Sequence, residues 1–260
     1  MTTSSPAAGR LVSLAAGTVL DVDPAETVSV AAGAGFGGAG IWFDPAAWTP
    51  GLARRVAQRL DATGIVALDV EPVLLSGDGD PGDALIEAAA GLGARFVLLG
   101  NRTLDDGAAV RRVTELCERA APAGITIAIE FLPPFAVGTL DAAVALAQKV
   151  GAPNVGVLVD TLHLARSGHS PDDLRRVPPA LLPYLQLADA PAELVGEWRE
   201  EALHGRLLPG EGALPLAEVL AAVPDVPVSM ELRSRRLMSD YPDPLDRARA
   251  VLHSVEPLLR

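Results

Sequence analysis

A repeating alternation of strand-like and helix-like segments constrains the fold of this chain more than any other feature. Short apolar runs rich in Val, Ile and Leu recur along the sequence, and Ala-, Leu- and Arg-rich segments with helical spacing lie between them. The predicted strands are 11–16, 38–43, 65–71, 95–100, 125–131, 155–160, 184–189 and 226–232. The predicted helices are 24–34, 50–62, 82–92, 104–121, 139–150, 171–177, 214–222 and 243–258.

The predicted strands are nearly continuous apolar runs, which is typical of parallel strands that are buried on both faces. Eight β/α units in 260 residues match the size of a (β/α)8 barrel, an α/β fold. We therefore predict a single TIM-barrel domain over residues 1–260, with a flexible N-terminus at 1–9. A doubly wound sheet is the alternative, but its glycine-rich turn should follow a strand, whereas GAGFGGAG at 33–40 precedes one.

Composition and charge exclude several classes of protein. A hydrophobic fraction of 49% is enough to form a large core, so we do not expect a disordered chain. No apolar run reaches the roughly 18 to 20 residues that a membrane span needs. One cysteine, Cys117, and a first segment (MTTSSPAAGR) unlike a secretion signal predict a cytoplasmic protein. The net charge of −12 argues against nucleic-acid binding.

Polar residues end or lie within each of the last four predicted strands: Glu130, Asp160, Gln186 and Glu231. In a closed barrel these strand ends converge, and three carboxylates that converge repel one another unless a cation lies between them. An all-oxygen set suits Mn²⁺ or Mg²⁺ best, then Co²⁺, and Zn²⁺ less well. We predict that these four residues bind one divalent metal ion; four separate structural side chains are the alternative.

Most of the chain resembles the xylose isomerase-like superfamily, the sugar phosphate isomerase/epimerase group of TIM barrels, and the resemblance is strongest from about 125 to 235. Five motifs between about 125 and 235 carry the resemblance: IAIEFLPP, LVDTLHLARSG, YLQLADAP, RLLPGEG and VSMELRS. The resemblance implies that Glu130, Asp160 and Glu231 are metal ligands. Gln186 stands where the family usually has a histidine, and this departure leaves the identity of the metal open.

The same resemblance implies substrate contacts for two residues. His163 follows Asp160 in a D-x-x-H pattern, and Arg206 opens an R-x-x-P-G-x-G loop. A loop histidine bonded to the backbone and a solvated arginine are the respective alternatives. Two more candidates for substrate binding are Asn101, after the fourth predicted strand, and Arg233, after the eighth. A guanidinium group suits a carboxylate, a phosphate or a pair of hydroxyl groups.

Three further features are open to more than one interpretation. We expect Asp189 to orient a neighbouring group rather than to bind metal. Asp69 and Glu71 end the third strand next to Pro72, which predicts a turn, so both a cavity and a surface placement remain open. The segment 191–205 is long for a connection between strand and helix, and either covers the site or packs outside it.

This set of residues predicts enolisation of a small keto-polyol or sugar. A divalent ion stabilises the enolate that forms when a proton leaves the carbon beside a carbonyl group. Glu130 and Glu231 would act as the acid–base pair, and His163 would complete the catalytic residues. Return of the proton gives an isomerase or epimerase, which is the outcome that the resemblance implies.

Two other functions remain as alternatives. Loss of a β-hydroxyl group from the same enolate gives a dehydratase of a cyclic keto-polyol such as 3-dehydroshikimate or inosose, and Gln186 favours this reaction. A barrel that binds a metabolite without catalysis is the second alternative. An endonuclease branch shares the fold but needs many more than the four histidines of this chain. The resemblance also suggests a homodimer or homotetramer.

Overall fold

Eight parallel strands form a closed barrel in the computed structural model, which describes residues 10–260. The predicted flexible N-terminus, 1–9, lies outside the described residues. All eight predicted strands are confirmed: β1 (Val12–Leu14), β2 (Gly38–Trp42), β3 (Val66–Leu75), β4 (Phe96–Asn101), β5 (Thr126–Glu130), β6 (Val155–Asp160), β7 (Leu185–Leu187) and β8 (Val228–Met230). Strand β1 pairs with both β2 and β8, so the sheet has no free edge and the doubly wound alternative is wrong.

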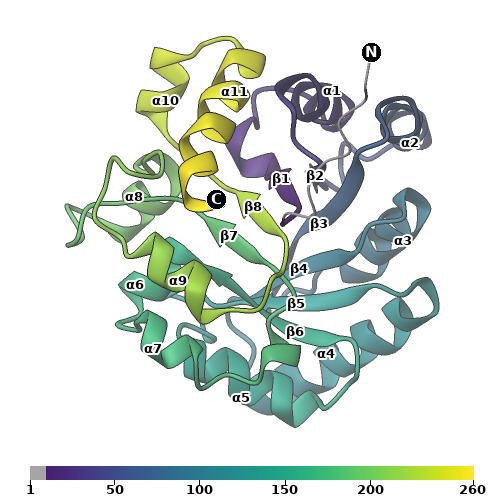
Figure 1. Ribbon diagram of the computed structural model, residues 1–260. Helices are drawn as coiled ribbons and strands as arrows, with labels where there is room; N and C mark the ends of the chain where they lie inside the picture. The colour runs from purple at the N-terminus through teal and green to yellow at the C-terminus, as the bar shows by residue number, and fades with distance from the viewer. Residues whose placement is uncertain (1–9) are drawn as a thin grey trace.

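The helices surround the strands, as Figure 1 shows. Helices lie at all eight predicted places: α1 (Pro24–Ala34), α2 (Pro50–Thr63), α3 (Gly82–Leu92), α4 (Asp106–Ala120), α5 (Leu140–Val150), α7 (Pro171–Leu174), α9 (Leu216–Ala222) and α11 (Pro244–Val255). Three short helices were not predicted: α6 (Thr161–Arg166), α8 (Trp198–His204) and α10 (Arg235–Asp240). These three follow β6, β7 and β8, the strands that end beside the predicted site.

Polar side chains fix where the outer helices begin. Asp23, Thr49, Asp105 and Thr139 each accept a hydrogen bond from a backbone N–H group in the first turn of α1, α2, α4 and α5. Such caps satisfy backbone donors that have no partner within the helix. Helix α5 ends at Gly151, whose φ of 62° is a conformation that glycine adopts without strain. Local sequence therefore sets the helix boundaries independently of the barrel.

The interior of the barrel changes from apolar to polar along its axis. An apolar cluster of Leu68, Leu98, Ala128 and Leu158, together with Tyr184, fills the part nearer the start of the strands. Nearer their C-terminal ends lie buried polar side chains from several strands, among them Ser13, Asp69, Gln186, Ser229 and the acidic residues of the predicted site. A larger cluster packs between the barrel and the helices. The apolar layer therefore lies beneath a cluster of buried polar side chains at the end where TIM barrels carry their active sites.

An irregularity in β3 turns two acidic residues toward this interior. The pairing of β2 with β3 shifts between Ala39 and Gly40, so that Asp69 lies opposite Gly40 and Glu71 lies opposite Trp42. Asp69 is 0% exposed and Glu71 is 3% exposed. Both carboxylates therefore occupy the interior, and the surface placement that Pro72 suggested is wrong.

Arg247 ties the last helix to the first βα connection. It is 1% exposed, and its guanidinium group donates to both carboxylate oxygens of Asp21, at 2.6 and 3.0 Å. It also donates to the backbone oxygen of Tyr241 at 3.1 Å. Helices α1 and α11 lie side by side in Figure 1. The pairing of β1 with β8 is thus reinforced outside the barrel by an ion pair between the buried Arg247 and the more exposed Asp21.

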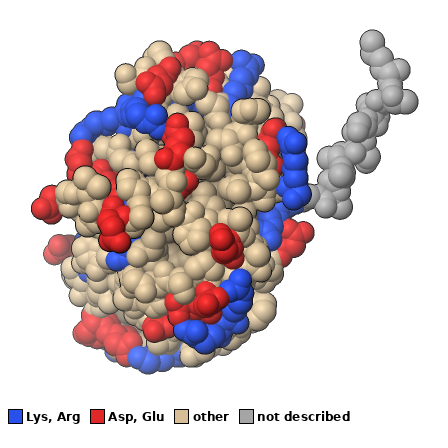
Figure 2. Space-filling model, turned by 60° about the vertical axis from the view of Figure 1, so that its left-hand side comes forward, with Lys and Arg blue, Asp and Glu red and all other residues tan. Residues whose placement is uncertain are grey.

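The outer surface carries charges of both signs. On the face that Figure 2 shows, Lys and Arg side chains lie among Asp and Glu side chains, with uncharged areas between them. Many of these charges are paired; Arg112, for example, contacts Asp80, Asp83 and Glu115. Within residues 10–260, no helix is both long enough and apolar enough to span a membrane.

Candidate functional site

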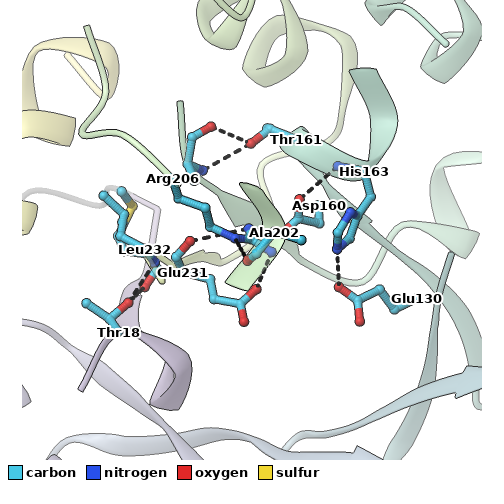
Figure 3. Close-up of polar contacts among 11 residues, drawn as sticks. Thr18, Glu130, Asp160, Thr161, His163, Ala202, Arg206, Glu231 and Leu232 are labelled. Atoms are coloured by element: carbon cyan, nitrogen blue, oxygen red, sulfur yellow. Dashed lines mark hydrogen bonds and ion pairs between the residues drawn. The ribbon is translucent and has the colours of Figure 1, made fainter. Parts of the chain in front are cut away.

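The structure brings together the four polar residues that were predicted to converge. Glu130 ends β5, Asp160 ends β6, Gln186 lies in β7 and Glu231 follows β8. Neighbouring strands are in register here, with Asp160 opposite Gln186. All four side chains are buried, with exposures between 0 and 9%. Figure 3 shows Glu130, Asp160 and Glu231 around one space at the end of the barrel.

Arg206 lies between two of these carboxylates. It is 2% exposed, and its Nη1 atom donates to Asp160 Oδ2 at 2.5 Å while its Nη2 atom lies 3.3 Å from Glu231 Oε2 (Figure 3). Its Nε atom donates to the backbone oxygen of Ala202 at 3.1 Å. Arg206 is therefore not a solvated arginine; it is a buried cation that balances part of the negative charge. Its predicted contact with a substrate stays a prediction.

His163 lies on the opposite side of Asp160 from Arg206. Its backbone N–H donates to Asp160 Oδ1 at 3.0 Å, and its ring Nε2 lies 3.8 Å from Glu130 Oε1. The ring is 2% exposed, and its Nδ1 atom has no hydrogen-bond partner within residues 10–260. Ligand atoms of Glu130, Asp160 and His163 all lie within 4.8 Å of one another. The cluster able to hold a metal ion therefore includes His163, which the sequence placed with the catalytic and substrate-binding residues but not with the metal ligands.

The side-chain amide of Gln186 tests whether this set fits a metal ion. One atom of the amide lies 3.2 Å from Glu130 Oε1 and 3.3 Å from Glu231 Oε2. An amide nitrogen at this position donates a hydrogen bond to each carboxylate. An amide oxygen there would lie 3.2 and 3.3 Å from the two carboxylate oxygens, close to the roughly 3 Å between adjacent ligands of an octahedral Mg²⁺ site. The amide can therefore bridge the two carboxylates through its nitrogen or, after rotation, present its oxygen, so the side chains are compatible with a divalent ion.

Burial and mutual repulsion set the ionisation of this cluster. Burial, followed by the charges of Glu231 and Asp160, raises the pKa of Glu130 well above its usual range. Burial also raises the pKa of Glu231, against the attraction of Arg206. For Asp160 burial acts in the same direction, but the Arg206 and His163 side chains hold its pKa below the usual value. Burial lowers the pKa of His163 to about 4, so this ring is neutral near pH 7.

The other two substrate-binding candidates lie in different environments. Asn101 is 2% exposed, and its side chain both donates to and accepts from the backbone of Leu104, at 3.0 Å in each case. It therefore closes the turn that follows β4. Arg233 is half-buried, and its side chain makes no hydrogen bond or ion pair within residues 10–260. For both residues the predicted contact with a substrate stays a prediction.

Two further buried residues lie near the site: Glu71, whose placement the sequence left open, and Tyr184, which the sequence analysis did not single out. The Tyr184 hydroxyl donates to Asp69 Oδ2 at 2.8 Å, and burial raises the pKa of Asp69 to about 7. Glu71 Oε1 is buried and has no hydrogen-bond partner in the described part of the chain. The signal for Asp69 and Glu71 was their spacing of two residues at the end of an apolar strand, which puts both on one face.

Asp189 holds the loop that carries Arg206. Its carboxylate accepts hydrogen bonds from the backbone N–H groups of Gly210, Gly212 and Leu214, at 2.9 to 3.0 Å. A Cβ atom on Gly212 would lie 2.3 Å from Asp189 Oδ1, so this close approach requires glycine. The expectation that Asp189 orients a neighbouring group is confirmed.

The segment 191–205 contains α8, which packs against the site. The Trp198 ring lies 5.5 Å from the His163 ring, measured between centroids. Glu201 accepts two hydrogen bonds from Arg166 of α6, at 2.6 and 2.7 Å, and both side chains are buried. The interpretation of this segment as a cover for the site therefore agrees with the structure.

Comparison with known proteins finds a family of the same fold, and relatives that are an isomerase and a dehydratase. The model of the xylose isomerase-like TIM barrel family matches residues 28–256. The inosose isomerase of Bacillus licheniformis is 31% identical over 119 residues, which cover 45% of this chain and 42% of that protein. The 3-dehydroshikimate dehydratase of Pseudomonas putida is 26% identical over 215 residues, which cover 76% of this chain and 33% of that protein.

A solved structure matches over nearly its whole length. The IOLI protein, crystallised with a zinc atom, superposes with a TM-score of 0.82 at 19% identity, covering 95% of this chain and 97% of that one. At this identity the likeness establishes the fold alone. The two curated relatives are matched over less than half of their own length. Because the family model covers most of the chain, and the barrel has the same architecture, the chain belongs to the xylose isomerase-like TIM barrel family.

Proposed function

We propose that this chain is a divalent-metal-dependent enzyme that enolises a small polyhydroxylated ketone, as an isomerase or epimerase. The observation that carries the proposal is the convergence of Glu130, Gln186 and Glu231: the Gln186 amide lies 3.2 Å from Glu130 and 3.3 Å from Glu231, and all three side chains are buried. The similarity to an inosose isomerase supports a ketone substrate that bears several hydroxyl groups.

Glu130, Asp160, Gln186 and Glu231 would hold the metal ion, with His163 close enough to contribute. A bound divalent ion supplies Lewis-acid polarisation of the substrate oxygens. Glu130 and Glu231 come from β5 and β8, and one carboxylate removes the proton beside the carbonyl group while the other returns it. The raised pKa values of both groups belong to the chain without metal, and a bound divalent ion would lower them and favour the carboxylate forms.

The surrounding residues prepare this cavity for proton transfer. Arg206 fixes the positions of Asp160 and Glu231 through the contacts described above. His163 is neutral near pH 7 and can donate or accept a hydrogen bond at a substrate oxygen. Helix α8 packs against His163 and limits the access of water. A shielded cavity protects a reactive enolate and strengthens the electrostatic interactions inside it.

A dehydratase is the second candidate. The similarity to a 3-dehydroshikimate dehydratase covers 76% of this chain, more than the similarity to the isomerase covers. The two reactions share the removal of the proton and differ only in whether a β-hydroxyl group then leaves. Incubation with 3-dehydroshikimate, followed by ultraviolet absorbance, detects the aromatic product of dehydration. Incubation with an inosose in deuterated water, followed by NMR, detects exchange at the carbon beside the ketone.

Metal content and metal-dependent melting test the proposed ligands. We expect the purified protein to hold about one equivalent of a divalent ion, and its melting temperature to fall on chelation and to recover with Mn²⁺ or Mg²⁺. Glu130→Ala and Glu231→Ala should lose the metal and this response. Glu87→Ala, which changes an exposed carboxylate on α3, is the matched control and should keep both.

Two outcomes would contradict the proposal. A protein that holds no metal and melts at the same temperature with every ion does not use metal-assisted enolisation. A protein that binds metal and keto-polyols but turns over neither an inosose nor 3-dehydroshikimate is instead a metabolite-binding barrel.

A further inference from the structure

Glu71 lies at the rim of the polar cavity in a fixed backbone position. Its backbone oxygen accepts a hydrogen bond of 2.7 Å from Phe43 N–H, and its partner in the sheet is Trp42. Because of the shift in the pairing of β2 and β3, its side chain is on the same face as Asp69 and points into the barrel. Glu71 therefore faces the cavity from the half of the barrel opposite to the proposed metal ligands.

The side chain of Glu71 has no hydrogen-bond or ion-pair partner among residues 10–260 that would account for its burial. The residue is 3% exposed, its Oε1 atom has no hydrogen-bond partner, and it forms no ion pair. Buried polar atoms nearly always have a partner, since an unsatisfied one costs free energy. The missing partner is therefore expected to be a group that arrives with the ligand and can donate a hydrogen bond.

The charges around Glu71 restrict which ligand this can be. Burial raises the pKa of Glu71 well above its usual range, and the negative charges of Asp69, Glu231 and Glu130 raise it further. The opposing cation is Arg233, which also acts on Glu231. The other buried cation, Arg206, is already bonded to Asp160 and Glu231. Counted as ionised, the five acidic side chains around the site outnumber the combined charges of the two arginines and one divalent ion.

We propose that Glu71 contacts the substrate directly, accepts a hydrogen bond from one of its hydroxyl groups, and makes the site selective for uncharged keto-polyols over keto-acids. This inference rests on the proposed function, since it concerns the substrate of the same cavity. A hydroxyl group can donate to the orphan oxygen of Glu71 whether this side chain is charged or protonated. A substrate carboxylate cannot donate and adds a like charge.

Binding of two unreactive ligands tests the inference without requiring turnover. Isothermal titration calorimetry of the Mn²⁺-loaded protein would compare myo-inositol, an uncharged cyclic polyol, with shikimate, a cyclic polyol that bears a carboxylate. We expect the wild-type protein to bind myo-inositol at least about tenfold more tightly than shikimate. Glu71→Gln should weaken myo-inositol binding about tenfold and strengthen shikimate binding. The difference between the two affinities should therefore become smaller than in the wild-type protein. Glu87→Gln, on the outer helix α3, should leave both affinities unchanged.

Stability measurements separate a contact with the ligand from a structural role. Glu71→Gln removes a charge that lies among like charges, so we expect its melting temperature to equal or exceed that of the wild-type protein. If this variant does not fold, Glu71→Asp keeps the carboxyl group but moves it away from the ligand, because the side chain is one methylene group shorter. A weakened affinity for myo-inositol is again expected. Unchanged affinities in a folded variant would overturn the inference, as would a wild-type protein that binds both ligands equally or neither.

Failure of the inference differs from failure of the proposed function. A wild-type protein that turns over a ketone while Glu71→Gln keeps the same ligand preference refutes the role of Glu71 alone. A wild-type protein that shows the preference for myo-inositol, loses it in Glu71→Gln and turns over no ketone refutes the enzymatic function alone.

Discussion

The buried positive charge of Arg206 is the dominant single-residue feature of the site. A buried ion pair is a weak source of net stability, but the loss of one partner leaves an uncompensated charge in the interior. Arg206 balances Asp160 and Glu231, at 2.5 and 3.3 Å. A metal ion near these carboxylates would also offset their negative charge. Without the arginine, the stability of the folded protein should therefore depend more strongly on bound metal.

We predict that Arg206→Met lowers the free energy of unfolding by about 3 kcal/mol in the presence of a chelator. Added Mn²⁺ should restore part of this loss, because the ion provides another positive charge. Urea denaturation with and without Mn²⁺ measures both effects. Arg236→Met removes an exposed pair with Glu211 and should change stability by less than about 0.5 kcal/mol. Equal losses in the two variants would contradict the prediction.

Asp69 should make the stability of the metal-free protein depend on pH. Its pKa is raised from 3.8 to about 7, first by burial, so the folded state holds its proton more tightly than the unfolded state does. This contribution to stability is fully present below about pH 4 and is lost as the pH rises to about 7. Relative to Asp69→Asn, the wild-type protein should therefore lose a few kcal/mol across this range and nothing further above it.

Urea denaturation of the wild-type protein and Asp69→Asn, in chelator at several pH values between 4 and 8, measures the difference. The asparagine oxygen can still accept the hydrogen bond from Tyr184, so the comparison isolates the charge. Parallel stability curves for the two proteins would show that Asp69 does not titrate in this range.

The sequence predicted the placement of site residues that lie at the ends of strands, because the strands themselves determine where those residues lie. Glu130, Asp160 and Glu231 were identifiable because each closes an apolar run, and parallel strands bring such ends together. Glu71 remained open because Pro72 suggested a turn, while the register of β2 and β3 decides where it points. The partners of Arg206 could not be predicted, since they come from two strands and depend on how a loop folds back.

The long helices were predicted closely, and two short ones, α7 and α9, were also predicted, whereas three other short helices were not. Helices α6, α8 and α10 have six or seven residues each, which is too few for a helix to be stable alone. They exist because of contacts with the rest of the molecule. In α8 these contacts are the Trp198 ring against His163 and the ion pair between Glu201 and Arg166.

We predict that Arg166→Met loosens α8. The substitution leaves Glu201 buried without its partner, so amide hydrogen exchange within 191–205 should speed up. The KM for a ketone substrate should rise severalfold, because α8 packs on His163. Arg235→Met removes an exposed contact with Glu200 of the same helix and is the matched control. Hydrogen exchange followed by mass spectrometry measures the effect, and equal protection in both variants would contradict the prediction.

The whole molecule depends on closure of the ring of strands. The number and order of the β/α units predicted a barrel, and the pairing of Val12 through Leu14 with Val228 through Met230 confirms that it closes. The contact between Arg247 and Asp21, which joins the last helix to the first connection, could not be predicted because the two residues are far apart in the sequence. Closure of this kind makes the first and last elements part of one cooperative unit.

We predict that Arg247→Met lowers the free energy of unfolding of the whole barrel by about 1 to 3 kcal/mol, because the backbone oxygens of Tyr241 and Thr18 lose a donor while the exposed Asp21 stays solvated. Circular dichroism and tryptophan fluorescence should follow one shared transition in urea at a lower midpoint. Arg249→Met removes an exposed pair on the same helix and should shift the midpoint little. An early transition confined to one of the two signals would show that the last helix unfolds independently.

The order of the proposed ligands along the chain has a consequence for biosynthesis. A nascent chain that has emerged only through β7 contains Glu130, Asp160 and Gln186, but it lacks Glu231 and the strand that pairs with β1. Because synthesis proceeds from the N-terminus, the cation-binding cavity is among the last parts of the molecule to form. Retention of a metal ion would then distinguish a finished barrel from a stalled or truncated one.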